Sequence, residues 1–393
     1  MTVVIIGGGV MGASTAWHLA REHGQEVVVL ERDNSYALAS SALSACAIRQ
    51  QFSTEINIRV SQASLAFYRN IGQHLATPDD TPDIGLVEPG YLYLAATSQG
   101  ADNLRAQHAL QHSLGVTTAL LDPDALRQRY PWMQVDDVHL GSLGVSTATS
   151  GEGWFDGYAA MQAFRRAAIE AGATFVEADA AAMITDANRV RGVRAVDGRE
   201  WLADHVVIAA GAWSARVAAM CGATLPVAAR KRDVFAIEAN VSLADGPLLI
   251  DPSGVWCRPE KTAGQFLCGA PPRNGDPDDV PLSQVDRSLF DEHIWPVLAS
   301  RIPDFDALRV TSSWAGYYEM NTFDHNGLVG RLTPWTNVYA ACGFSGHGLQ
   351  QAPAVGKGLA ELIATGAYQT LDLSPFTIDR IAAGQPLLER NVI

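Results

Sequence analysis

Residues 3–12 read Val3-Val4-Ile5-Ile6-Gly7-Gly8-Gly9-Val10-Met11-Gly12. The four apolar residues at the start are typical of a parallel strand that is covered on both faces. The glycines that follow have the spacing G-x-G-x-x-G, at Gly7, Gly9 and Gly12. The residues that follow predict a helix to about residue 24 and a second strand over 27–30 that ends in Glu31.

The order strand, glycine turn, helix, strand and acid indicates a dinucleotide-binding unit. Gly7 allows the tight turn, Gly9 lets a pyrophosphate approach the backbone, and Gly12 lets the helix pack on the strand. Glu31 suits a ribose hydroxyl, and the helix N-terminus offers N–H groups to the anion. Those N–H groups belong to Val10 and Met11. A glycine turn that binds nothing is the weaker alternative, and the motif does not distinguish FAD from NAD.

Composition excludes several classes of protein. The 393 residues include 28 Lys+Arg and 42 Asp+Glu, a formal charge of −14, which argues against nucleic acid or an anionic membrane as a partner. Five cysteines without Cys-x-x-Cys spacing predict neither a disulfide framework nor a zinc site, so we expect no metal and a cytoplasmic location. Residues 2–20 carry no charge, but their glycines and polar residues favour a buried strand and helix over a signal peptide or a membrane span.

One arginine stands alone in a neutral loop. Residues 34–54 contain Arg49 as their single charged residue, among many Ala and Ser residues. Small side chains let backbone pass close to a flat ligand, and a lone guanidinium there suits a substrate carboxylate. The alternatives are that Arg49 pairs with a distant acid or reaches water.

The rest of the chain suggests two alternating units. We expect residues 1–77, 151–225 and 323–393 to build the nucleotide-binding domain, and 78–150 with 226–322 to build a substrate domain of antiparallel strands. The strand over 204–211 ends in Ala210-Gly211, which either abuts the cofactor or forms an ordinary turn. The basic run 230–232 is expected on a solvated turn.

A second strand, glycine-rich turn and helix follow near the C-terminus. Val338-Tyr339-Ala340-Ala341 runs into the segment Gly343-Phe344-Ser345-Gly346-His347-Gly348-Leu349-Gln350, and a helix is predicted over 353–365. This turn again points backbone donors at a ligand. No carboxylate or histidine neighbours His347 in sequence, so a metal site is not expected there.

These segments together resemble the D-amino-acid-oxidase superfamily of flavoproteins, on the branch with glycine oxidase and monomeric sarcosine oxidase. The FAD-dependent oxidoreductase domain-containing proteins are the nearest in pattern. The resemblance rests on the glycine motif, the loop to Arg49, residues 206–214, and Trp314-Ala315-Gly316 through the glycine-rich turn at 343–350. It implies an α/β plus α+β fold, in which a discontinuous, Rossmann-like FAD-binding domain accompanies an antiparallel-sheet substrate domain.

The resemblance also implies roles for individual residues. FAD would be held by the glycine motif, Glu31 and Arg32, with Ser40 and Ser41 near the flavin and the backbone of Ala181 near the adenine. The remaining cofactor-binding positions would be Ala210, Gly211, Gly343, Gly346, His347, Gly348, Leu349 and Gln350. Arg49 falls where sarcosine oxidase places a carboxylate-binding arginine. Tyr318 stands where glycine oxidase has its carboxylate arginine and Gln350 replaces a lysine, so we expect these two residues to orient the substrate. Arg258 is a weaker candidate that could instead pair with Glu260.

Several departures qualify this comparison. Gly316 stands where sarcosine oxidase has a cysteine bonded to flavin, so we expect non-covalent FAD. Leu267 stands where a lysine promotes reaction with oxygen, which leaves O2, a quinone or a protein open as electron acceptor. The expected substrate is a small amine or amino acid, such as glycine, sarcosine or a D-amino acid. The rival interpretations are a scaffold flavoprotein and an NAD-dependent dehydrogenase. The sequence leaves the oligomeric state open, and a homo-oligomer is one alternative.

Overall fold

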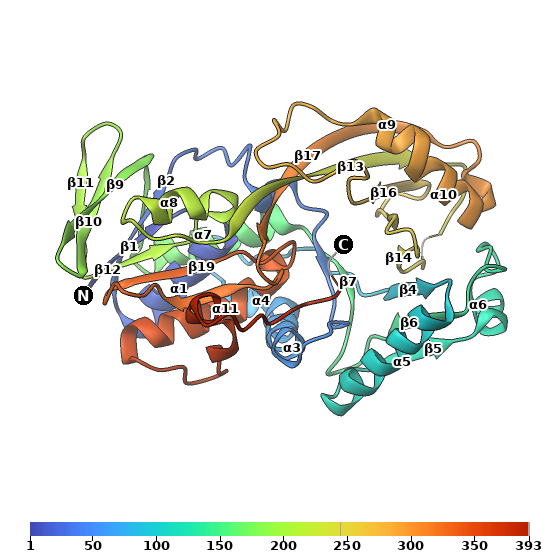
Figure 1. Ribbon diagram of the computed structural model, residues 1–393, viewed down its shortest axis with the longest axis horizontal. Coiled ribbons are helices and arrows are strands. Elements are labelled where there is room, and N and C mark those ends of the chain that lie inside the picture. The colour runs from blue at the N-terminus through green and yellow to red at the C-terminus, as the bar shows by residue number, and fades with distance from the viewer. Residues whose placement is uncertain (244, 392–393) are drawn as a thin grey trace.

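The computed structural model describes residues 1–243 and 245–391, and its strands form two main sheets (Figure 1). The first sheet has six strands in the order β18-β19-β12-β1-β2-β8. All neighbours pair in parallel except β18 and β19. Its strands are β1 (Thr2–Ile6), β2 (Glu26–Glu31), β8 (Thr174–Glu177), β12 (His205–Ile208), β18 (Leu328–Arg331) and β19 (Val338–Cys342).

Both faces of this sheet are buried, as the apolar run in β1 predicts. Val3 and Ile5 enter the core beneath the helices, whereas Val4 and Ile6 enter a second core on the opposite face. The first face is covered by α1 (Val10–His23), α3 (Glu55–Arg69), α7 (Gly157–Glu170) and α11 (Gly348–Thr365). The opposite face carries α8 (Ser214–Ala219) and a three-stranded sheet of β9 (Ala180–Asp186), β10 (Arg189–Ala195) and β11 (Glu200–Leu202).

The second sheet has eight strands in the order β17-β13-β16-β15-β14-β4-β6-β5. The expectation of a wholly antiparallel sheet is wrong at one place, because β14 and β4 pair in parallel. These two strands come from distant segments, so no tight turn fixes their relative direction. The strands are β4 (Tyr91–Ala95), β5 (Thr118–Leu121), β6 (Leu140–Gly144), β13 (Val227–Glu238), β14 (Leu248–Ile250), β15 (Trp256–Pro259), β16 (Gln265–Gly269) and β17 (Arg309–Asn321).

The two sheets draw on alternating parts of the chain. Strands of the six-stranded sheet come from within 1–77, 151–225 and 323–393, and those of the eight-stranded sheet from within 78–150 and 226–322. The short strands β3 (Ala47–Ile48) and β7 (Gly153–Trp154) pair with each other. The remaining helices are α2 (Ser40–Leu43), α4 (Ile71–His74), α5 (Ser98–Ser113), α6 (Pro123–Arg129), α9 (Arg287–Leu289), α10 (Trp295–Arg301) and α12 (Asp379–Ala382). Within the described residues, no helix has the length and apolar character needed to cross a membrane.

The basic run 230–232 is not on a solvated turn, because it lies inside β13. Strand β13 pairs along its length with β17, and each basic residue has an acidic partner. Arg230 pairs with Asp278 at 3.1 Å, Lys231 with Asp233 at 3.0 Å, and Arg232 with Asp276 at 2.8 Å. These acids balance the positive charge of the basic run, which the sequence predicted to lie in solvent.

Helix α11 begins at Gly348, earlier than the predicted start at 353, so Pro353 lies inside the helix. Proline has no N–H, and the carbonyl of Leu349 therefore loses its helical donor. The hydroxyl of Tyr68 on α3 donates to that carbonyl at 2.6 Å. A side chain from a neighbouring helix thus replaces the missing bond and allows the helix to start at the glycine-rich turn.

Candidate active site and cofactor cavity

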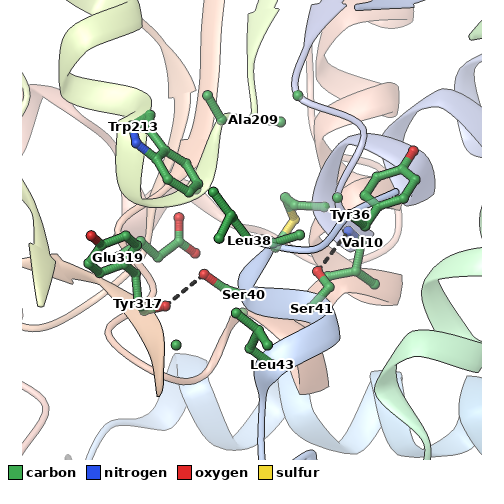
Figure 2. Close-up of a pocket in the computed structure, with 18 of the residues that line it drawn as sticks. Val10, Tyr36, Leu38, Ser40, Ser41, Leu43, Ala209, Trp213, Tyr317 and Glu319 are labelled. Carbon is green, nitrogen blue, oxygen red and sulfur yellow. Dashed lines mark hydrogen bonds between the residues drawn. The ribbon is translucent and has the colours of Figure 1, made fainter. Parts of the chain in front are cut away.

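A cavity of about 530 Å³ runs between the carboxyl ends of the central strands and the long strand β17 (Figure 2). Figure 2 shows Val10, Tyr36 and Ser41 on one side, and Trp213, Tyr317 and Glu319 on the other. Ligands in open α/β sheets bind at this edge. The predicted residues that line it are Gly7, Gly9, Val10, Met11, Glu31, Arg32, Ser40, Ser41, Ala210, Gly211, Tyr318, Gly346, Gly348 and Leu349.

The glycine turn has the shape that its motif requires. Gly7 has φ +106°, in the region that side chains disfavour. A Cβ on Gly12 would lie 1.9 Å from the carbonyl oxygen of Gly7, so this position packs the helix on the strand without itself lining the cavity. A Cβ on Gly9 would meet only the Ser41 hydroxyl at 3.5 Å, which leaves the backbone open toward the cavity.

Polar groups around the turn are largely fixed before any ligand arrives. Glu31 accepts hydrogen bonds from the N–H of Gly8 at 2.8 Å and of Asp33 at 3.0 Å, and retains lone pairs for a ribose hydroxyl. Ser41 accepts the N–H of Val10 at 3.1 Å, so its own proton stays available to an anion. Ser40 instead donates to the carbonyl of Tyr317 at 2.6 Å, and thus ties α2 to β17 (Figure 2).

Besides Gly12, four predicted cofactor residues lie outside the cavity wall: Ala181, Gly343, His347 and Gln350. In β9 it is Ala180 that lines the cavity, because successive side chains of a strand point to opposite faces. Gly343 has φ +73°, and a Cβ there would meet Asn321 and Val227 at 3.3 Å. His347 and Gln350 are buried beside Arg49 instead.

Several lining residues were missed by the sequence reasoning. Trp213 packs its ring 3.8 Å from the guanidinium carbon of Arg32, an arrangement that fixes both side chains. Burial raises the pKa of Glu319 to about 7, so this carboxylate titrates within the cavity near neutral pH. Both residues fall inside segments already singled out, 206–214 and 314–350, but nothing in the sequence indicated their direction.

Arg49 is buried outside the lining of this cavity, close to two of its predicted partners, Gln350 and Tyr318. Its N–H donates to the Oε1 atom of Gln350 at 2.9 Å, and its guanidinium carbon lies 4.0 Å from the centre of the Phe52 ring. Burial raises the pKa of Tyr318, and the charges of Arg232 and Arg49 oppose that shift, so the phenol lies within reach of both cations. Burial also raises the pKa of Tyr91 and Tyr93, and the Arg49 charge opposes both shifts. The sequence did not suggest these two residues.

Arg49 does not reach water, because its side chain is only 3% exposed. Among residues 1–243 and 245–391, its direct hydrogen-bond partners are carbonyl oxygens and not a carboxylate. Its Nη1 atom donates to Gln51 at 2.7 Å, and its Nη2 atom donates to the backbone oxygen of Asn391. The buried Glu152 lies nearby and accepts the N–H groups of Gln50 at 2.6 Å and Gln51 at 2.8 Å, which shapes the loop behind the guanidinium.

Arg258 has a different set of partners. Its guanidinium lies 2.7 Å from the carboxylate of Glu260, so the predicted ion pair is confirmed, and its Nε donates to the carbonyl of Ala45 at 3.2 Å. Arg258 does not line the cavity. No group of three or more His, Cys, Asp or Glu residues within 1–243 and 245–391 is arranged to hold a metal ion.

A parallel sheet with a glycine turn at its edge, joined to a second sheet that walls the cavity, defines a dinucleotide-dependent oxidoreductase. Residues 2–362 match the family described as FAD dependent oxidoreductase. FAD-dependent oxidoreductase domain-containing protein 1 of Xenopus laevis is 39% identical over 100% of this chain and 84% of its own length. The chain therefore belongs to the FAD dependent oxidoreductase family and is an FAD-dependent enzyme.

More distant relatives extend the comparison. Glycine oxidase of Geobacillus kaustophilus is 26% identical over 96% of each chain. L-Proline dehydrogenase from P. horikoshii superposes with a TM-score of 0.85 at 26% identity, covering 98% of both chains. The resemblance predicted from the sequence motifs is confirmed, and with it the choice of FAD over NAD.

The residues present fit FAD. Gly9 leaves room for a pyrophosphate, Ser41 keeps a free hydroxyl proton, and Glu31 keeps lone pairs for a ribose. Gly316 lines the cavity without a nucleophilic side chain, and a Cβ there would already lie 3.0 Å from Leu43. Non-covalent binding is the prediction that follows.

Proposed function

We propose that this enzyme oxidises the Cα–N bond of a small amino acid or N-substituted amino acid. FAD supplies the hydride acceptor for such a reaction. The protein binds and orients the substrate, and the imine product hydrolyses in water. The observation that carries the proposal is the buried Arg49, whose backbone N–H is held by Gln350 and whose charge acts on the neutral phenols of Tyr91, Tyr93 and Tyr318.

A guanidinium in these buried surroundings suits an amino acid carboxylate. Its planar donors match the two oxygens, and burial strengthens the charge-assisted bonds. Burial and the Arg49 charge lower the pKa of His347, so its imidazole adds no competing positive charge near neutral pH. The neutral phenols of Tyr91 and Tyr318 are placed to orient a carboxylate or an amine without carrying charge themselves.

The names of the relatives agree with this reaction class. Glycine oxidase, sarcosine dehydrogenase and L-proline dehydrogenase are the names of proteins that match most of this chain. Their substrates differ in size and in substitution at nitrogen, so these names support the bond that is oxidised and do not select one amino acid.

The test is an anaerobic titration of the flavin absorption band with glycine, sarcosine, proline and D-amino acids. We expect one of these to bleach the band, and Arg49→Ala to raise the concentration needed at least tenfold while FAD content is unchanged. Arg49→Lys keeps the charge without the planar donors and should fall between the two. A scaffold role for the flavoprotein would be supported instead if none of the amines reduced the flavin.

The same purified protein can be used to identify the electron acceptor. Leu267 is buried and lies across from Arg258 on the neighbouring strand. It stands where the resemblance expects a lysine that promotes reaction with oxygen. We therefore infer a preference for a quinone or protein acceptor over O2. Dye reduction much faster than peroxide release on one substrate would support this preference, and equal rates would contradict it.

A further inference from the structure

A segment at the C-terminal end of the described chain covers Arg49. We call residues 387–391 the strap; they run from the six-stranded side toward the junction of the two sheets (Figure 1). The carbonyl oxygen of Asn391 accepts a hydrogen bond from Nη2 of Arg49. A neutral backbone oxygen therefore occupies one of the donor positions of the Arg49 guanidinium.

The strap is held by hydrogen bonds between its own residue Glu389 and residues at the start of α3. Glu389 is 1% exposed and accepts hydrogen bonds from the N–H and hydroxyl of Ser53 at 2.8 and 2.7 Å. It also accepts from Thr54 at 3.0 Å and Asn57 at 3.0 Å. Burial acts to raise the pKa of Glu389, but the hydrogen bond from Ser53 and the charge of Arg49 outweigh it and lower the pKa, so the carboxylate stays ionised near neutral pH.

The last described residue is fixed through its side chain. Nδ2 of Asn391 donates to the carbonyl of Gln51 and to Oε1 of Gln107, each at 2.9 Å. Its Oδ1 accepts from Nε2 of Gln107 at 3.1 Å. These bonds orient the residue so that its backbone oxygen meets Arg49.

We propose that the strap is a displaceable plug, and that a substrate carboxylate competes with the Asn391 carbonyl for Arg49. The inference rests on the proposed function, in which Arg49 binds a carboxylate. A carboxylate is the stronger partner, because charge-assisted hydrogen bonds are about twice as strong as neutral ones. Breaking the bonds that dock the strap costs part of this gain, so substrate binding and strap release are coupled.

Acetate, the smallest carboxylate, tests this coupling in the FAD-loaded protein through its effect on the flavin spectrum. Asn391→Ala removes the side-chain bonds that dock the strap and should tighten acetate binding about tenfold, since less of the protein is then plugged. Arg390→Ala is the matched control, because its exposed side chain makes no hydrogen bond in the described structure, and it should bind acetate like the parent. Unchanged or weaker binding by Asn391→Ala, or no spectral change in either protein, would overturn the proposal.

Hydrogen–deuterium exchange gives a second readout that does not depend on a variant. The N–H of Arg390, which donates to the Ser53 hydroxyl at 2.9 Å, should lose protection when acetate is bound. Full protection with acetate bound would also overturn the plug. Failure of the proposed function has a different signature, because Arg49→Ala would then leave acetate binding unchanged whatever the strap does.

Discussion

The N–H of Arg49 donates a 2.9 Å hydrogen bond to the side-chain oxygen of Gln350, and this bond joins residues 301 positions apart. It connects the neutral loop after the first nucleotide-binding segment to the first turn of α11. The side chain of Gln350 therefore sets where the guanidinium can stand, although it does not line the cofactor cavity.

Gln350→Leu should leave this buried N–H without an acceptor. A buried unsatisfied donor costs about 1–3 kcal/mol, so the free energy of unfolding should fall by that amount. The apparent affinity for the amino acid substrate should weaken as well, because Arg49 loses its brace. Urea unfolding and flavin titration measure the two effects. Gln350→Glu keeps an acceptor oxygen and should retain more of both; a stable leucine variant would contradict the bracing role.

The ion pair between Asp324 and Arg380 should be a major contributor to stability. Nε of Arg380 lies 2.7 Å from Asp324, whose side chain is fully buried. Asp324→Ala leaves an unpaired buried cation, which costs about 3–5 kcal/mol. The exposed pair of Arg191 and Asp186 provides the control, since Asp186→Ala should change stability by about 0–1 kcal/mol. Similar losses in both variants would refute the contrast.

Substitutions at two glycines of the same motif should have different effects, one on stability and the other on FAD binding. Gly12→Ala places a methyl group against the Gly7 carbonyl and should lower the melting temperature of the apoprotein. Gly9→Ala meets only an ordinary contact, so the apoprotein should melt as the parent does while FAD per chain falls sharply. Calorimetry and flavin absorbance separate the effects. Normal FAD content in Gly9→Ala would show that the pyrophosphate does not pass there.

Stability should fall between about pH 4.5 and pH 7 through Glu152. Burial raises the pKa of this carboxylate from 4.5 to about 7, although hydrogen bonds from Gln51 and Gln50 oppose the shift. A pKa raised by folding means that the stabilising proton is bound below the unfolded pKa and is lost as pH rises through the folded value. Glu152→Gln should flatten the melting-temperature profile in this window, with Glu319 accounting for what remains. An unaltered profile would exclude Glu152 as the source.

Free FAD should be recovered from denatured protein. Gly316 has no side chain that could bond to flavin, so acid precipitation should leave all of the yellow colour in the supernatant. Flavin fluorescence of supernatant and pellet measures the partition. Colour retained in the washed pellet would require another attachment residue.

The cofactor half of the site was predictable from sequence because its signals are local. The turn from Gly7 to Gly12 and the carboxylate of Glu31 depend on neighbours within one strand–helix–strand unit. Arg49 stood out because its surroundings in sequence lack charge. That Arg49 lies near Gln350 and Tyr318 was expected only from the family resemblance, and not from the residue pattern itself.

The rest depends on contacts between segments far apart in the chain. Nothing in residues 387–391 suggests that Asn391 meets Arg49. The basic run 230–232 looked solvated because Asp276 and Asp278, its partners, come from a later loop. The predicted start of α11 was too late, because Pro353 was expected to begin the helix. The carbonyl that Pro353 leaves without a helical donor is bonded by the hydroxyl of Tyr68, which belongs to another helix.

The strand order has a consequence for how the protein is made. β1 lies between β2 and β12, and β12 pairs on its other side with β19, which ends at Cys342. Most of the chain therefore has to be synthesised before β19 can pair with β12 and complete the sheet at the nucleotide cavity. Until then, one edge of β12 stays open to other partners. We expect chaperone engagement and aggregation during synthesis to concentrate on nascent chains that end before β19.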